Sequence, residues 1–253
     1  MNFVKQIYIV ALALFPACLM GMELPSNTDH GILKKYDKHG APITLEWYKT
    51  HDAKTLSDLL KPLIPVMADA FADEAILFRN FLFDEERQTI KPECAALLEE
   101  LPAEVRQWID VRIHLGAQDR QTRFAGTLAS YEQKFEKEFI AKWAPVNPFV
   151  VIAKEGEKVL GMMLFCRISL EPELELPKNA VYVDEFGVKA EAQGRGIGKL
   201  LLFSVFELCS DVTQIFLDTG IWNTKAQAVY KALGFNVREC KEFAHVGFQF
   251  IKK

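Results

Sequence analysis

The segment with the clearest chemical potential is a glycine-rich run that lies between a β-forming stretch and an apolar helical stretch. Its residues are Gln193, Gly194, Arg195, Gly196, Ile197, Gly198 and Lys199. Glycine permits positive φ angles and lets the backbone approach a ligand closely. Successive N–H groups at the start of a helix attract anions, and Arg195 and Lys199 add positive charge. The pattern predicts a pocket for a phosphate or a diphosphate.

Two common phosphate-binding motifs do not fit this run. A P-loop has four residues between its first glycine and its Gly-Lys pair, followed by Ser or Thr, whereas here Leu200 follows Lys199 and the spacing is one residue shorter. A dinucleotide fingerprint has the spacing G-x-G-x-x-G at the start of a βαβ unit. Here the spacing is G-x-G-x-G and it occurs late in the chain. Both ligand classes are therefore disfavoured.

The elements that position this loop follow from hydrophobic periodicity. Strands are predicted over 43–48, 149–153, 159–169, 180–188, 213–219 and 243–251. Helices are predicted over 55–71, interrupted by Pro62 and Pro65, and over 199–208 and 223–233, with 72–145 mostly helical. The stripe Tyr131, Phe135, Phe139 and Trp143 indicates core packing rather than base stacking. The fold class is α+β, with a mixed sheet and helices on both faces.

Composition excludes several classes of protein. The chain has 253 residues, of which 50% are hydrophobic and 25% charged, an ordinary globular mixture rather than a disordered one. Its 30 basic and 34 acidic residues give a net charge of −4, which argues against a general nucleic-acid binder. Cysteines and histidines show no metal-ligand spacing, so we expect no metal.

The N-terminal segment 1–22 differs from the rest of the chain. Lys5 is its only charged side chain, and the apolar run 7–21 is typical of a signal or anchor segment. The alternative is a hydrophobic first element or an overlong start. We expect a cytoplasmic protein if 1–22 is not a signal and an exported or membrane-anchored one otherwise, with 23–40 a linker and 41–253 one domain.

Two motifs together resemble the GNAT superfamily of N-acetyltransferases. The family's Q/R-x-x-G-x-G/A signature is matched by Gln193, Gly196 and Gly198. Its later motif is matched by Trp222, Asn223, Ala226, Tyr230, Leu233, Gly234 and Phe235. The resemblance covers 148–239, the expected coenzyme A-binding core. It does not extend to 72–145, which we expect to be a helical insertion on the acceptor side.

The resemblance implies a mostly antiparallel sheet splayed at its central strand, with acetyl-CoA as cosubstrate and no metal. The diphosphate would lie on 193–199. The pantetheine would pair with Phe186, Gly187 and Val188, with a β-bulge at Gly187 and the thioester oxygen held by an N–H near Gly187 or Val188. Asn223 would contact the cosubstrate.

The resemblance also implies catalytic residues. Tyr230 would protonate the departing thiolate. Asp184 and Glu185 are candidates for the base, and strand alternation predicts that they point to opposite faces. We prefer Asp184, since its position carries an acid in several family members; the alternative is that both residues are structural or bind the acceptor.

The expected function is transfer of an acetyl group to a primary amine by direct attack. The acceptor could be a small molecule or a protein amine, and the sequence specifies neither it nor the oligomeric state. No nucleic acid partner is expected, and membrane association only through 1–22. The alternative is an inactive coenzyme A-binding or interaction module on the same fold, or an exported form of it.

Overall fold

The computed structural model describes residues 29–50, 52–99, 103–169, 174–240 and 245–252. Within them one large sheet has the order β1-β2-β5-β6-β7-β8-β10-β9. Its strands are β1 (Asp29–Tyr36), β2 (Pro42–Lys49), β5 (Phe149–Glu155), β6 (Lys158–Cys166), β7 (Ala180–Val188), β8 (Gln214–Gly220), β9 (Asn236–Arg238) and β10 (His245–Ile251). Only β7 and β8 pair in parallel. The sheet is therefore mixed and mostly antiparallel, as expected.

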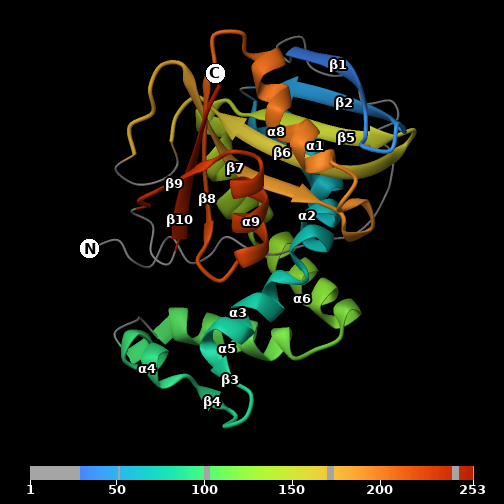
Figure 1. Ribbon diagram of the computed structural model, residues 1–253. Coiled ribbons are helices and arrows are strands. Elements are labelled where there is room, and N and C mark those ends of the chain that lie inside the picture. The colour runs from blue at the N-terminus through green and yellow to red at the C-terminus, as the bar shows by residue number, and fades with distance from the viewer. Residues whose placement is uncertain (1–28, 51, 100–102, 170–173, 241–244, 253) are drawn as a thin grey trace.

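Helices cover both faces of this sheet (Figure 1). One face packs against α1 (Ala53–Leu60), α2 (Ile64–Phe71), α6 (Arg120–Lys134) and the turns that follow it, including α7 (Ala141–Trp143). The other face packs against α8 (Ile197–Leu208) and α9 (Thr224–Ala232). Strand β5 is buried along almost its whole length, because helices lie on both of its sides.

A helical unit extends away from the sheet at the lower end of the molecule in Figure 1. It consists of α3 (Glu74–Leu82), α4 (Pro92–Glu99), α5 (Ala103–Gly116) and the short hairpin of β3 (Phe83–Asp84) and β4 (Thr89–Ile90). A small apolar core holds it together, formed by Phe78, Leu82, Cys94, Ile109 and Ile113. The predicted helical character of 72–145 is confirmed, apart from this hairpin.

Strands β7 and β8 separate partway along their length. Their parallel register runs from Ala180 opposite Gln214 to Val183 opposite Leu217, and there the pairing ends. The residues that follow on both strands line a common cavity. The sheet is thus splayed at its centre, as the family resemblance implies.

Most predicted elements agree with the structure within a few residues. Pro62 and Pro65 divide the 55–71 segment into α1, a 3₁₀ turn and α2 because proline cannot continue a helical hydrogen-bond ladder. The linker prediction is wrong for 29–36, which form β1 at the sheet edge. Turn-forming residues in and beside this segment made the alternating pattern of a strand hard to recognise. The segment 1–22 lies outside the described residues.

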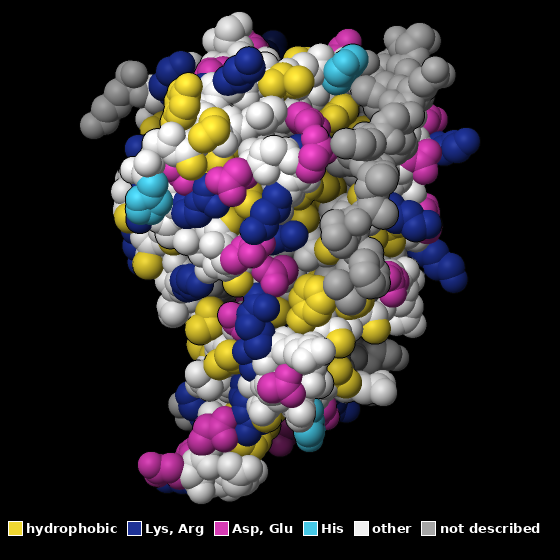
Figure 2. Space-filling view, turned by 90° about the vertical axis from the view of Figure 1, so that its right-hand side faces the viewer, with side chains coloured by type: hydrophobic (Ala, Val, Ile, Leu, Met, Phe, Trp, Pro, Cys, Tyr) yellow, Lys and Arg dark blue, Asp and Glu magenta, His cyan; other side chains and the backbone are white. Residues whose placement is uncertain are grey.

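One face of the molecule has mixed charge (Figure 2). Acidic and basic side chains are interspersed on the face shown in Figure 2.

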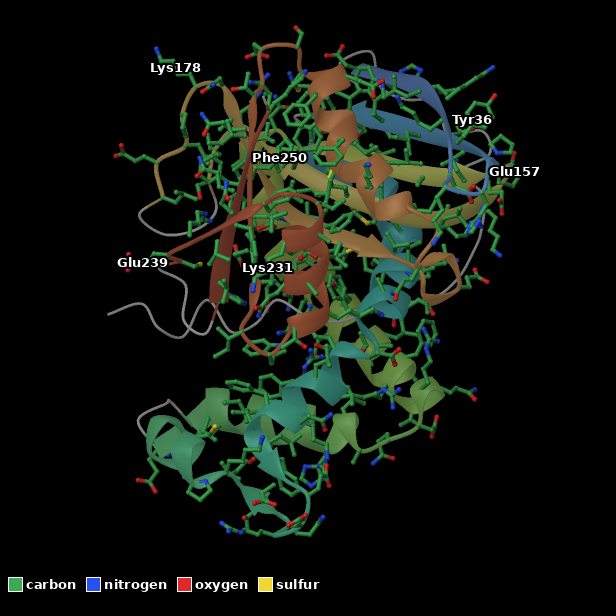
Figure 3. The ribbon with its side chains drawn as sticks, viewed as in Figure 1. Tyr36, Glu157, Lys178, Lys231, Glu239 and Phe250 are labelled. Carbon is green, nitrogen blue, oxygen red and sulfur yellow. The ribbon has the colours of Figure 1, made fainter. Side chains whose placement is uncertain are left out.

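Phe250 of β10, labelled in Figure 3, packs against Phe203 of α8. None of the helices in the described ranges has the length and apolar character needed to cross a bilayer.

Candidate active site

A cavity of about 1190 Å³ lies where the sheet splays. Its walls come from α2, α3 and β7, from the glycine-rich loop and the start of α8, and from β8 and α9. Of the predicted site residues, only Arg195 is not part of these walls. The tertiary structure therefore brings the glycine loop, both candidate carboxylates and Tyr230 to one space.

The glycine-rich loop leads into α8 with a backbone geometry that suits an anion, and we call this arrangement the glycine cradle. Gly194 and Gly196 have φ angles of +77° and +87°, a region that side-chain-bearing residues seldom adopt. The first intrahelical bond of α8 runs from the Leu200 N–H to the Gly196 carbonyl, so the preceding N–H groups have no helical acceptor. No side chain caps this helix. These donors, with the helix dipole, suit a phosphate group.

Close packing also explains Gly198. A Cβ at this position would lie 3.0 Å from the Cζ of Phe186, so a side chain would push the start of α8 away from β7. Ile197 is buried in the core at 1% exposure. Its side chain holds the helix in place, and only its backbone is available to a ligand.

The structure corrects the role expected of Arg195. Its guanidinium lies 2.8 Å from Asp37 and 2.5 Å from Glu155, and hydrogen bonds to Glu155 and Asp37 raise its pKa. The charge is thus committed to fixing the loop against β5 and the β1–β2 turn. The sequence shows a cation beside the glycines, but its ion pairs with Asp37 and Glu155 hold the side chain outside the cavity wall.

Other cations surround the cradle instead. Lys38, Lys199 and Lys225 line the cavity, and Lys199 is exposed. Lys225 donates to the Gln193 side-chain oxygen at 2.5 Å, and Gln193 donates to the Val188 carbonyl at 3.1 Å. Gln193 therefore joins the loop to β7 and α9. Lys38 and Lys225 were missed from sequence because they belong to distant segments.

A β-bulge lies at Asp184 and not at Gly187. Leu164 of β6 pairs with Glu185 and Phe165 pairs with Val183, so Asp184 has no opposite residue. An extra residue on one strand re-aims the side chains beyond it. The predicted bulge at Gly187, which pairs with Met162, is therefore wrong.

The bulge also overturns the expectation that Asp184 and Glu185 point to opposite faces. Asp184 contacts Lys142 and Trp143 on the face covered by α7. Gly187 lies two residues after Glu185 and is therefore on the same face of the strand. This face packs against α2, because a Cβ added to Gly187 would be 2.9 Å from the Cβ of Ala70. Both carboxylates therefore lie on the same side, at the cavity wall.

Asp184 is fully engaged by partners. Lys142 Nζ lies 2.9 and 3.0 Å from its two oxygens, and Trp143 Nε1 donates at 2.5 Å. Its side chain is only 8% exposed. Both of its oxygens are already occupied by the donors of Lys142 and Trp143, so these contacts favour a structural role.

Glu185 is the contrasting carboxylate. It is 5% exposed, it lines the cavity, and no hydrogen bond to its side chain is found among the described residues. Burial, and next the charge of Asp184, raise its pKa well above the usual value, while Lys142 opposes the rise. Such a carboxylate holds a proton more readily than an exposed one and suits a general base.

Two further acids adjoin Glu185. The charges of Glu74 and Asp218 both contribute to its raised pKa. Glu74 accepts from Trp222 Nε1 at 3.0 Å, and its other oxygen lies 3.6 Å from Arg112. Asp218 accepts a hydrogen bond from the Tyr182 hydroxyl. These residues come from α3 and β8, and no motif in the sequence connected them with the site.

Tyr230 lines the same cavity as these acids. It is 7% exposed and packs against Phe248, Phe235 and Phe186, with ring centroids 5.2, 5.8 and 6.5 Å away. Burial, reinforced by the charges of Asp218 and Glu74, raises its pKa. The phenol therefore stays protonated at neutral pH and can donate a proton.

The exposed edge of β7 presents backbone groups to the cavity. The Lys189 N–H bonds the Leu160 carbonyl on the β6 side, and the Gly187 carbonyl faces Gly161 of β6. Since backbone groups alternate sides along a strand, the N–H of Val188 faces the split. Of the two N–H groups expected to hold an oxygen atom, the one at Val188 has the suitable direction.

Asn223 has a structural task at the edge of the cavity. Its side-chain oxygen accepts from the Ala226 N–H at 3.1 Å and so caps α9, a role that asparagine often has at helix starts. It also lines the cavity. No cluster of three or more metal-binding side chains occurs in the part of the chain that the structure describes.

The acetyltransferase (GNAT) family model matches residues 115–235. A search of curated proteins found no match.

Several solved structures are similar to the chain. The GNAT domain of PAT from S. lividans is 17% identical, with a TM-score of 0.46 over 90% of this chain and 99% of that one. PaiA N-acetyltransferase from Thermoplasma acidophilum, solved in complex with coenzyme A, is 12% identical, with a TM-score of 0.43 over 82% and 98%. A GNAT family acetyltransferase from Elizabethkingia anophelis with acetyl-CoA bound is 16% identical, with a TM-score of 0.36 over 46% and 82%.

The matched range of the family model contains β5 to β8, the glycine loop, α8 and α9. These are the elements that build most of the cavity, and the sheet they form is splayed between β7 and β8. Residues 115–235 therefore belong to the GNAT family of acetyltransferases.

Proposed function

We propose that the protein transfers an acetyl group from acetyl-CoA to a primary amine. The observation that carries the proposal is the single cavity that joins the uncapped N-terminus of α8 to Glu185 and Tyr230. One end suits a diphosphate, and the other holds a candidate base and a candidate acid. Family membership supports acyl transfer between them.

The residues present fit the cosubstrate. The N–H groups before Leu200 would bind the diphosphate, and Lys199, Lys38 and Lys225 would add positive charge. The β7 edge from Phe186 to Val188 would pair with the pantetheine chain. The thioester then supplies an electrophilic carbon, with its oxygen near the Val188 N–H.

Glu185 is our choice for the base, in place of Asp184. Amines are mostly protonated at neutral pH, so Glu185 would first take a proton from the ammonium. The neutral nitrogen forms a bond to the acyl carbon, and the carbon–sulfur bond breaks. The Val188 N–H stabilises the charge that develops on oxygen.

Tyr230 completes the proton transfers. Its hydroxyl gives a proton to the departing sulfur. It then recovers a proton from the amide nitrogen, either by way of neighbouring side chains or through water. The net products are the acetylated amine, free thiol and one proton. Its raised pKa keeps the phenol in the donating form.

Two measurements test the proposal. Calorimetric titration with coenzyme A should show saturable binding, and incubation with acetyl-CoA and a panel of amines should release free thiol. Absence of both heat and thermal shift with coenzyme A would overturn the proposal. Binding without thiol release from any amine would favour the inactive module instead.

A further inference from the structure

We propose that the acceptor is a small primary amine that carries one compact apolar group, such as an arylalkylamine. The inference rests on the proposed function and specifies its substrate class. It comes from the part of the cavity beyond Glu185, which the cosubstrate does not need. We call this part the apolar chamber, and its walls are Leu77, Phe78, Phe81, Leu82, Cys94, Leu98, Ile109 and Trp222.

The apolar chamber is built by the helical unit that the family motifs do not cover. Among the described side chains of α4 and α5, those that line the cavity are Cys94, Leu98 and Ile109, all apolar. Phe78 and Trp222 meet edge to face at 4.8 Å between ring centroids and close the wall between α3 and the start of α9. An aryl or branched alkyl group would find aromatic and aliphatic partners there.

The junction between the apolar chamber and the acyl site is acidic. Glu185 and Glu74 are 5% and 8% exposed. Glu185 has no side-chain hydrogen-bond partner in the described ranges, and Glu74 Oε2 is buried without a hydrogen bond. Buried carboxylate oxygens that lack a donor favour binding of a cation. An ammonium group placed there would donate to Glu185 and to Glu74 Oε2, whose present contact is an ion pair with Arg112 at 3.6 Å, and would bring its nitrogen to the base.

These two features together define the ligand. The cationic amine of the ligand would lie at the acidic junction, and its apolar group would lie in the apolar chamber. A polyamine fits less well, since its second ammonium would lie against Phe78 and Leu82, and the described cavity-lining residues of α4 and α5 include no carboxylate. The wall residues Phe78, Leu82 and Ile109 are 3–5% exposed, so an apolar group placed against them would be shielded from water.

The test compares 2-phenylethylamine with putrescine and a lysine-containing peptide as acceptors of acetyl-CoA. We expect kcat/KM for 2-phenylethylamine to be about 10-fold or more above the others, the range that burying an apolar group provides. Equal or better use of putrescine or of the peptide would overturn the inference. Since thiol release with any amine supports the proposed function, the two can fail separately.

Substitution of a partly exposed wall residue sharpens the test. Phe81 is 37% exposed, so Phe81→Glu should fold. It should lower kcat/KM for 2-phenylethylamine about 10-fold while coenzyme A affinity stays unchanged. The matched control is Val111→Glu, at a 59% exposed position on α5 outside the cavity walls. An unaltered preference in Phe81→Glu, or an equal loss in Val111→Glu, would overturn the chamber's role.

Binding alone provides a readout without catalysis. Titration of 2-phenylethylamine into the protein without acetyl-CoA should give a saturable heat that Phe81→Glu weakens and Val111→Glu retains. Loss of coenzyme A binding with retained amine binding would sink the proposed function but leave the chamber's ligand class supported. No amine binding and no preference in turnover would sink the inference.

Discussion

At the scale of single residues, the two adjacent carboxylates on β7 differ because their partners differ. Asp184 is held by Lys142 and Trp143, whereas Glu185 faces the cavity without a donor. The sequence shows two acids side by side and cannot separate them. Their difference arises from α7, which is distant in sequence and adjacent in space.

We predict that Glu185→Gln lowers kcat/KM by about 10²–10⁴-fold, the usual contribution of a general base. Asp184→Asn should mainly destabilise the fold, by less than the ~3–5 kcal/mol typical of breaking a fully buried pair, since Lys142 is partly exposed. Steady-state kinetics and urea denaturation separate these effects. If Asp184→Asn remains folded and loses more turnover than Glu185→Gln does, Asp184 and not Glu185 is the base.

The pH dependence of Glu185 has a definite sign. Because its folded-state pKa is raised, the native protein binds the proton more tightly than the unfolded chain does. Its contribution to stability is present at low pH and is lost as pH rises through the folded pKa. Activity should rise over the same interval. Relative to wild type, the Tm of Glu185→Gln should increase with pH, and a difference constant with pH would contradict this.

Tyr230→Phe removes only a hydroxyl from a ring that is well packed among Phe186, Phe235 and Phe248. We expect turnover to fall about 10²–10⁴-fold, with coenzyme A affinity nearly unchanged. Single-turnover kinetics with calorimetry would check both. Unchanged turnover would remove the proton-donor role.

At the scale of elements, the glycine loop depends on backbone angles that few residues adopt. Gly196→Ala places a side chain at φ +87°, which strains the start of α8 by about 1–2 kcal/mol. The N–H groups of the cradle should then lose alignment, and coenzyme A should bind about 10-fold more weakly. Calorimetry measures this loss directly.

The matched control is Gly156→Ala, at φ +57° in the β5–β6 turn with open space around the new Cβ. This variant should also lose stability because of its positive φ angle. Its coenzyme A affinity should not change, because Gly156 is not part of the cavity wall. If both variants weaken binding alike, the cradle has no special role.

At the scale of the whole molecule, the helical unit is joined to the sheet through Trp222. The indole donates to Glu74 of α3 and packs on Phe78. Trp222→Phe should destabilise the protein by about 1–3 kcal/mol, because a buried carboxylate loses a donor. KM for the acceptor should rise while coenzyme A affinity is retained, as urea denaturation, kinetics and calorimetry would show.

Trp47→Phe is the control for this change. It removes an indole N–H from β2, outside the cavity walls, and should leave acceptor KM unchanged. An equal rise in KM in both variants would argue against a link between the helical unit and acceptor binding.

Much of the architecture could be predicted from the sequence because the signals are local. Periodicity located the main strands and helices, prolines marked the break between α1 and α2, and the glycine spacing located the loop that we propose binds the diphosphate. Strand β1 was missed since its edge position leaves it mostly exposed. No sequence pattern indicated that Lys38 lies beside the glycine-rich loop or that Glu74 lies near Glu185.

What the sequence determined by itself is the fold family, the glycine cradle and the identity of Tyr230 and the acid pair as candidates, because these depend on residue type and short-range spacing. Only the tertiary structure decided which acid is open to the cavity and that Arg195 supports the loop. It also decided that an apolar chamber meets buried carboxylates. The physical reason is that a bulge at Asp184 and long-range ion pairs set side-chain direction, and neither follows from local pattern.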